Sequence, residues 1–417
     1  MGFSSNFSAH VDEQGRLILP PEAIHRYGLQ PGAKVYLSQR ENVLGLRRPV
    51  SHLAKIYVEP TNTCNLTCRT CIRNSWQEPP GQMSKDTFRR ILQGLSAFSP
   101  LPRVFFGGFG EPLAHPDIIE MVTQAKALGA SVELITNGTM LTRRLSRQLI
   151  EAGLDLLWVS LDGATPQSYA DVRLGAAFPN VLDNLHEFRD VRQAAYRITP
   201  RLGIVFVAMK RNVGDLPALV TLGRQLGAQN FLVSNVLPYT EEMCQEVLYT
   251  RAVTNMIYET TQPESSLELT RLDFNEITRE PLYQILHGDQ SLSFAGFSSG
   301  EGNDRCPFIE SGATAISWEG YLSPCLPLLH SHVSFLLKRE RLSRHFQVGD
   351  IMERTLKDLW NAPEYLALRE RVQTFDFSPC TSCGGCFLAE ANEEDCFGNT
   401  FPTCGGCLWA QGVIRCP

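Results

Sequence analysis

Three cysteines within one short run constrain this chain more than any other feature of its sequence. Cys64, Cys68 and Cys71 stand in Cys-Asn-Leu-Thr-Cys-Arg-Thr-Cys, shortly after the apolar stretch 56–58. Thiolates at this spacing can hold three corners of a [4Fe-4S] cluster, and they leave the fourth iron without a protein ligand. A structural zinc site is the alternative, but it normally has a closed set of four ligands. We therefore expect a small molecule to supply the last ligand.

Length and composition indicate a globular protein with two or three domains. The chain has 417 residues, of which 43% are apolar and 20% are charged. Its net charge of -6 argues against a general affinity for nucleic acid. The first residues lack the pattern of a signal peptide and no apolar stretch approaches bilayer length, so we expect a cytoplasmic protein without a membrane anchor. In that compartment the 13 cysteines point to metal rather than to disulfides.

Residues 1–50 form a separate β-rich unit in this interpretation. Gly15 lies in a turn, Pro20-Pro21 opens a short helix, and Pro31-Gly32 precedes another strand. This order resembles the AbrB/SpoVT swapped-hairpin domain, which implies an intertwined homodimer that often binds DNA. Up to Lys34 the unit carries as many acidic as basic residues, so we favour dimerisation or partner docking over DNA binding.

Residues 51–290 alternate apolar strands with amphipathic helices. The expected strands are Lys55–Val58, Arg103–Phe106, Ser131–Ile135, Leu156–Leu161, Leu202–Ala208 and Asn230–Val233. Ser84, Pro116 and Thr142 stand where three of the helices should begin. Six such units predict an α/β fold, a parallel sheet curved into a partial (βα)6 TIM-like barrel. Reacting groups then gather at the carboxyl ends of the strands.

Polar motifs follow the expected strands at these ends. The second strand runs into Gly107, Gly108, Gly110 and Glu111, where glycines would let a ligand approach the backbone and the carboxylate could accept from an ammonium. Short polar side chains suited to ribose hydroxyls follow the third and fourth strands, namely Asn137, Ser160 and Asp162. Their order on successive strands carries more weight than any single motif.

This combination resembles the radical S-adenosylmethionine (SAM) superfamily over residues 51 to about 240. The resemblance implies that Cys64, Cys68 and Cys71 hold a [4Fe-4S] cluster whose open iron binds the amino and carboxylate groups of SAM. It places Gly107, Gly108, Gly110 and Glu111 at the amino group and Asn137, Ser160 and Asp162 on the ribose side. Arg173 would meet the SAM carboxylate or lie on a helix surface. Thr70 departs from the family, which often has an aromatic residue there.

The chemistry implied by the resemblance is radical chemistry. A low-potential electron donor of the ferredoxin or flavodoxin type would reduce the cluster, and SAM would then be cleaved to methionine and a 5′-deoxyadenosyl radical.

The third part of the chain, residues 300–417, is dense in cysteine. Cys306 and Cys325 flank an expected hairpin that turns at Glu319-Gly320, and residues 292–304 read as a linker. The remaining thiols that we assign to metal are Cys380, Cys383, Cys386, Cys396, Cys404, Cys407 and Cys416. Two Cys-x2-Cys pairs also fit a zinc ribbon. However, nine thiols leave five surplus around one zinc, whereas two four-iron clusters use eight.

The Cys306-x13-Gly320-x4-Cys325 element resembles the SPASM extension of radical SAM enzymes, which implies two auxiliary [4Fe-4S] clusters. Two departures are that the later thiols do not keep the usual SPASM spacing and that Leu326 stands where some members have a catalytic aspartate. The cysteine-rich tail 395–417, the AbrB-like start and the stretch Asn235–Glu242 together resemble the radical SAM maturases associated with tungsten-cofactor oxidoreductases. That resemblance implies maturation of an aldehyde ferredoxin oxidoreductase-like enzyme. Modification of a ribosomal peptide and a DNA-binding redox sensor are the alternatives.

Overall fold

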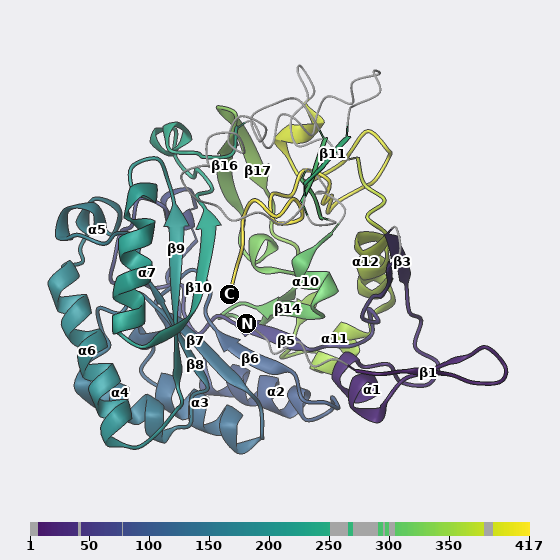
Figure 1. Cartoon of the computed structure of the whole chain (residues 1–417), viewed down its shortest axis with the longest axis horizontal. Coiled ribbons are helices and arrows are strands. Elements are labelled where there is room, and N and C mark those ends of the chain that lie inside the picture. Colours follow the sequence, from purple (N-terminus) through teal and green to yellow (C-terminus); the bar gives the residue numbers. More distant parts are fainter. Residues whose placement is uncertain are drawn as a thin grey trace.

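One nine-stranded sheet runs through the centre of the computed structural model (Figure 1). The structure describes residues 7–40, 43–76, 78–250, 266–269, 291–294, 297–299, 305–378 and 387–417. The strand order is β10-β9-β8-β7-β6-β5-β14-β15-β18. The six barrel strands are mutually parallel, with bounds β5 (Lys55–Val58), β6 (Arg103–Phe106), β7 (Val132–Thr136), β8 (Leu156–Ser160), β9 (Arg201–Ala208) and β10 (Ala228–Asn235).

The predicted strands agree closely with the observed ones. β5 and β6 match residue for residue, and the other four differ by no more than two residues at either end. The agreement has a physical reason, because strands buried on both faces read as apolar runs. Ile56 and Val58, for example, are both fully buried. The predicted α/β fold with a parallel sheet is confirmed.

Helices α2–α7 line the outer side of the barrel strands (Figure 1). Their bounds are α2 (Lys85–Leu95), α3 (Ile118–Ala127), α4 (Arg143–Glu151), α5 (Pro166–Val172), α6 (Phe178–Ala194) and α7 (Leu216–Gln225). Ser84 caps α2 as predicted, since its Oγ accepts the Thr87 N–H at 3.0 Å. Thr142 caps α4 in the same way through the Leu145 N–H. Both helix starts are therefore fixed by local sequence.

The sheet continues beyond the predicted barrel. β14 (Ala313–Ile316) pairs in parallel with β5, and β15 (Tyr321–Ser323) returns antiparallel to it. The expected hairpin is therefore present, with Gly320 at a φ of +106° in its turn. β18 (Gly349–Asp350) pairs with β15 at the edge of the sheet. The cysteine-rich part is thus built onto the barrel through one shared sheet.

The segment expected to be a linker contains two strands instead. β12 (Ser291–Phe294) pairs with both β11 (Ser266–Leu269) and β13 (Phe297–Ser299) to form a small separate sheet. The alternation of Ser with Leu or Phe over residues 291–294 is compatible with a strand. The high Gly and Ser content of the surrounding residues favoured a linker instead.

The other elements of the C-terminal part surround the end of the barrel sheet. They are α10 (Pro307–Glu310), η5 (Leu326–Leu328), β16 (His332–Leu336), β17 (Arg339–Ser343), α11 (Leu356–Trp360), α12 (Pro363–Thr374) and η6 (Leu388–Glu390). The hydrophobic core of the barrel extends into α11 and α12 through Trp360 and Tyr365. None of the helices described is both long enough and apolar enough to cross a bilayer.

The N-terminal unit consists of two short hairpins and one helix, with bounds β1 (His10–Val11), β2 (Leu17–Ile18), α1 (Pro21–Tyr27), β3 (Leu37–Arg40) and β4 (Val43–Leu46). The turn at Gly15 and the helix after Pro20 were both predicted. The unit rests on α12, where Arg47 Nη1 donates to the Gln373 carbonyl at 2.6 Å. Gln373 Nε2 donates in return to the Arg48 carbonyl at 2.8 Å.

Candidate functional site

The three-cysteine loop follows β5 at the carboxyl end of the sheet. The Arg69 N–H donates to the Val172 carbonyl at 3.0 Å, which ties the loop to the end of α5. The Cys71 N–H donates to the Cys68 carbonyl at 3.1 Å, and η1 (Ile72–Asn74) follows directly. These backbone bonds hold the loop in a turn that returns toward its own start. The loop therefore lies where the sequence predicts reacting groups to gather.

The thiols of this loop fit the donor set of a cluster. Cys64, Cys68 and Cys71 are all free and partly buried. Burial, aided by the neighbouring thiols, raises the pKa of Cys71 to about 11 and raises that of Cys68. Asn137 Nδ2 donates to Cys64 Sγ at 3.8 Å, and hydrogen bonds to sulfur are a normal feature around such clusters. Among the described residues, no three His, Cys, Asp or Glu side chains surround a point where one ion could bind.

The glycine loop after β6 packs first of all against the protein itself. A Cβ on Gly110 would overlap the backbone carbonyl of Thr61, and one on Gly108 would lie 2.6 Å from Glu59 Cγ. Gly107 is similarly enclosed, by the rings and methyl groups of the strands beside it. The glycines thus let this loop lie close to the segment that leads into the cysteines, and their approach to a ligand stays a prediction.

Glu111 is buried and joins the ends of β6 and β7. Its Oε1 accepts from Thr136 Oγ1 at 2.7 Å and from the Leu113 N–H at 3.0 Å, while Oε2 accepts from the Asn137 N–H at 2.7 Å. Burial raises the pKa of this carboxyl, against these three hydrogen bonds. A carboxylate has about four acceptor positions, and the described residues occupy three of them.

Asn137 and Ser160 end their strands as predicted, and Asn137 reaches the cysteine loop. Its Nδ2 donates to Asn65 Oδ1 at 2.9 Å, and its Oδ1 accepts from Thr139. Ser160 is the last residue of β8 and is buried. Asn137 therefore organises the loop around Cys64.

Asp162 and Arg173 form a buried ion pair beside the loop. Arg173 Nε and Nη2 lie 2.8 Å and 2.7 Å from Asp162 Oδ2, and the Val207 N–H donates to Oδ1 at 2.8 Å. The side chains are 11% and 0% exposed for Arg173 and Asp162, so Arg173 does not lie on a helix surface. Burial opposes the charge on Arg173, but Asp162 outweighs it and raises the pKa of the guanidinium. Its Nη1 is not used by Asp162.

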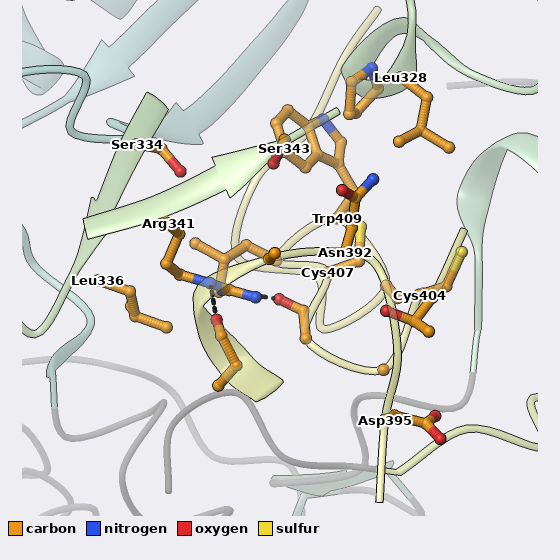
Figure 2. Close-up of a pocket in the computed structure, with 18 of the residues that line it drawn as sticks. Leu328, Ser334, Leu336, Arg341, Ser343, Asn392, Asp395, Cys404, Cys407 and Trp409 are labelled. Atoms are coloured by element: carbon orange, nitrogen blue, oxygen red, sulfur yellow. Dashed lines mark hydrogen bonds between the residues drawn. The ribbon is translucent and has the colours of Figure 1, made fainter. Parts of the chain in front are cut away.

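The thiols of the C-terminal part surround a second site. A cavity of about 240 Å³ is lined by Cys306, Cys325, Cys396, Cys404 and Cys407 (Figure 2). These come from three separate segments of the chain. Burial raises the pKa of Cys306, Cys325 and Cys404, and the charges of neighbouring thiols raise each of them further. Cys380, Cys383 and Cys386 lie outside the described residues.

Arg341 crosses this cavity from β17. Figure 2 shows it donating to two backbone carbonyls, those of Ala389 at 2.9 Å and Gly406 at 3.0 Å. Burial lowers the pKa of the guanidinium, and the nearby Cys407 opposes this. The arginine thus ties together the two backbone segments that flank the thiols.

Cys416 lies at the open side of the barrel, on the last residues of the chain. The Arg415 N–H donates to Ser234 Oγ of β10 at 2.9 Å, while Tyr57 Oη of β5 donates to the Pro417 carbonyl at 2.6 Å. This segment therefore spans from the last barrel strand to the first. Trp409 Nε1 donates to Cys416 Sγ at 3.2 Å.

The sequence interpretation missed one buried polar group next to the glycine loop. Glu59 follows β5 directly, accepts the Phe109 N–H at 3.0 Å, and contacts His330 from the C-terminal part. The signal for Glu59 was its place at the carboxyl end of a strand. Nothing in the local sequence marked His330, because it comes from a segment 271 residues away.

Family models match two parts of this chain. The model described as the radical SAM superfamily matches residues 58–203, and the SPASM model, described as an iron-sulfur cluster-binding domain, matches residues 306–387. A radical SAM domain binds SAM at a [4Fe-4S] cluster, and a SPASM domain binds further iron-sulfur clusters. These groups are therefore cofactors of this chain.

Similar proteins support both the family and the fold. A Pyrococcus furiosus protein named tungsten-containing aldehyde ferredoxin oxidoreductase cofactor-modifying protein is 30% identical over 366 residues, which cover 87% of this chain and 96% of that protein. Mycofactocin maturase MftC of Mycobacterium tuberculosis is 30% identical over 172 residues, 41% of each chain. The structure of Streptococcus suis SuiB bound to precursor peptide SuiA has a TM-score of 0.52 at 15% identity, covering 88% of this chain and 76% of that one. The last similarity shows the fold.

Sequence, fold and donor set thus agree with these matches. The chain is an enzyme of the radical SAM superfamily, and it carries a C-terminal SPASM iron-sulfur domain.

Proposed function

We propose that this enzyme cleaves SAM reductively at a cluster held by Cys64, Cys68 and Cys71, and that it acts in the maturation of a tungsten-cofactor oxidoreductase. The observation that carries the first part is the partly buried three-thiol loop at the carboxyl end of β5. The second part is supported by the Pyrococcus furiosus relative, which is named for modifying the cofactor of a tungsten-containing aldehyde ferredoxin oxidoreductase. The match covers 96% of that relative.

The reactive species comes from the cofactors, and the protein binds and orients them. When bound, the cluster and SAM together supply a 5′-deoxyadenosyl radical that abstracts hydrogen from a substrate. We assign the electron to a ferredoxin- or flavodoxin-type donor.

We assign three side chains to the binding of SAM. Glu111 has one acceptor position left for the amino group, and Arg173 has Nη1 left for the carboxylate. Asn137 lies between the cysteine loop and the end of β7, where it could meet a ribose hydroxyl. Ser160 and the loop glycines complete this assignment. In this assignment Asp162 orients Arg173 and does not contact SAM, because its oxygens already contact Arg173 and the Val207 N–H.

An apolar layer would keep water from this site. Trp76 and Phe109 meet edge to face with ring centroids 5.6 Å apart, next to Cys71 and the buried Tyr239. Exclusion of water protects a radical from side reactions.

We propose a partition of the C-terminal thiols in which the positions of the described ones assign the first set, and the remaining thiols form the second set by elimination. Cys306, Cys325, Cys404 and Cys407 are mutually close and would hold one auxiliary cluster. Cys396 with Cys380, Cys383 and Cys386 would hold the second. Cys416 lies near Cys407, but its sulfur accepts a hydrogen bond from Trp409 Nε1. We therefore leave Cys416, the ninth C-terminal thiol, outside both clusters.

The proposed domains are residues 1–50, 51–290 and 300–417. The first is proposed to be an AbrB-like module that dimerises. Its support is the exposure of apolar side chains on both hairpins of the module: Val11, Leu17, Ile18, Leu37, Leu44 and Leu46.

An anaerobic reconstitution experiment tests the function. We expect about twelve irons per chain, because three four-iron clusters are implied. Wild type should form 5′-deoxyadenosine from SAM and dithionite, whereas Cys64→Ala, Cys68→Ala and Cys71→Ala should form none and retain about eight irons. Cys404→Ala should lose about four irons, whereas the matched control Cys244→Ala should lose none.

The target is tested with the reconstituted enzyme and an inactive tungsten oxidoreductase. We expect activation of the oxidoreductase that depends on SAM and fails with Cys68→Ala. About four irons plus zinc would contradict the auxiliary clusters, and modification of a peptide without any effect on the oxidoreductase would contradict the target.

A further inference from the structure

A histidine of the C-terminal part is buried between two carboxylates at the mouth of the barrel. His330 follows η5, and its ring Nε2 lies 2.7 Å from Glu59 Oε2, at the end of β5. Its Nδ1 contacts Glu78 Oε2 in the loop after η1. Carboxylates accept hydrogen bonds, so both ring nitrogens must donate, and only the imidazolium can do that. The geometry therefore favours a positive charge on His330, with both glutamates ionised.

This ion pair is removed from water. The side chain of His330 is 2% exposed and that of Glu59 is 0% exposed, while Glu78 is 27% exposed. Trp76 lies edge to face with the imidazole at 4.6 Å between centroids, and Phe109 lies at 5.9 Å. A buried charge without its partner is costly, so removal of the imidazolium should disturb Glu59 strongly.

The groups that face His330 set the pH range of its charge. Burial opposes protonation, but the hydrogen bonds and charges of Glu59 and Glu78 outweigh it and raise the pKa of His330 to about 9. His332 on β16 also lies near His330, and its Nδ1 is 3.0 Å from the His330 carbonyl. Burial lowers the pKa of His332. Glu319 in the hairpin turn is a further titratable group in this region. Burial raises the pKa of its carboxyl, and the charge of Glu78 raises it further.

Glu59 connects His330 to the glycine loop 107–111. Its Oε2 faces His330, and its Oε1 accepts the Phe109 N–H at 3.0 Å. The loop lies so close that a Cβ on Gly108 would stand 2.6 Å from Glu59 Cγ. One carboxylate therefore joins the C-terminal part to the backbone that leads into Glu111.

We propose that His330 is a positioning residue, whose imidazolium fixes Glu59 and through it the loop 107–111 for binding of SAM. This inference rests on the proposed function for its ligand. It makes SAM binding depend on the docked C-terminal part. That part is held nearby by a further bond, in which the Phe335 N–H of β16 donates to the Pro238 carbonyl at 2.8 Å.

The first measurement needs no SAM. Hydrogen exchange at pH 7 would compare wild type with His330→Gln and the control His345→Gln, which changes an exposed histidine that contacts only Ser331 among the hydrogen bonds of the described residues. We expect the peptide containing Phe109 to exchange about tenfold faster or more in His330→Gln, and at the wild-type rate in the control. Equal exchange in all three proteins would overturn the inference.

The second measurement is SAM affinity of the reconstituted proteins, matched for iron content, between pH 7 and 10. We expect His330→Gln to raise the Kd for SAM about tenfold or more, and the wild-type Kd to rise as pH passes through about 9, where the imidazolium is lost. His330→Gln should show no such pH step. In a Glu59→Gln background His330→Gln should add little, because the buried carboxylate is already gone. A full effect of His330→Gln in that background would contradict the proposed link.

The two proposals can fail separately. If iron-loaded wild type binds no SAM, the proposed function is wrong, and hydrogen exchange still decides the role of His330. If wild type binds SAM and His330→Gln binds it equally well over the whole pH range, the role of His330 is wrong and the function stands.

Discussion

At the scale of single residues, charges buried beside the cysteine loop decide the geometry of the site. Asp162 accepts hydrogen bonds from Arg173 Nε and the Val207 backbone, and Arg173 Nη2 adds a second ion-pair contact. A side chain with this many protein partners serves as a support for another residue. The sequence assigned it to the ribose, since an Asp after a strand has the same appearance whether its partner is a ligand or a buried arginine.

Substitution of Asp162 should therefore cost stability. Asp162→Asn leaves the guanidinium of Arg173 buried without its counter-charge, which should lower the free energy of unfolding by about 3 kcal/mol. The matched control is Asp171→Asn, because Asp171 pairs with Arg211 but is 46% exposed. The control should cost only about 0–1 kcal/mol. Urea unfolding followed by tryptophan fluorescence would measure both, and equal costs would contradict a supporting role for Asp162.

At the scale of elements, the β14–β15 hairpin joins the two iron-sulfur regions. β14 extends the sheet from β5, whose end carries the first cysteine loop, and Cys325 follows β15. Gly320 makes this turn with a φ of +106°, and a Cβ there would lie 3.2 Å from Thr87 Cγ2. The turn thus controls where Cys325 stands relative to the barrel.

Gly320→Ala should disturb the auxiliary site and spare the first one. The left-handed backbone strain costs about 1–3 kcal/mol, and relief of that strain would move Cys325. We expect reconstituted Gly320→Ala to lose about four irons, one cluster, while it still cleaves SAM. Gly214→Ala is the control, because a Cβ at Gly214 meets nothing within 4 Å and the backbone needs no special φ. Iron analysis and 5′-deoxyadenosine formation check both, and a full iron content in Gly320→Ala would count against this linkage.

At the scale of the whole molecule, the N-terminal module leaves apolar side chains in water. Val11 is 69% exposed and Leu44 is 65% exposed, on separate hairpins of the module. Apolar patches of this kind commonly mark protein–protein contacts. The other side of the module rests on α12, so it would carry a second chain next to the SPASM part.

Charges placed on this surface should separate the chains. We expect wild type to be a dimer in light scattering coupled to size exclusion, and Val11→Lys with Leu44→Lys to be a monomer that retains its iron. Tyr196→Lys, on the exposed turn after α6, is the control and should leave the dimer intact. A monomeric wild type would contradict dimerisation through this module.

Features that depend on neighbours along the chain could be predicted from local sequence. The strands β5 and β6, the helix starts at Ser84 and Thr142, the turn at Gly320 and the three-thiol loop all follow from local patterns: apolar runs, capping oxygens, a glycine φ, and ligand spacing. These patterns were enough to predict the α/β fold with its parallel sheet, and the motifs among them carried the resemblance to the radical SAM family.

Contacts between distant segments could be identified only from the tertiary structure. It brought Cys306 and Cys325 to Cys404 and Cys407, paired Asp162 with Arg173, and placed His330 against Glu59. The physical reason is that such contacts depend on the order of strands in the sheet and on the docking of the C-terminal part onto β5. No periodicity within a short stretch records that order, so the spacing of the thiols could not show that Cys306, Cys325, Cys404 and Cys407 lie together.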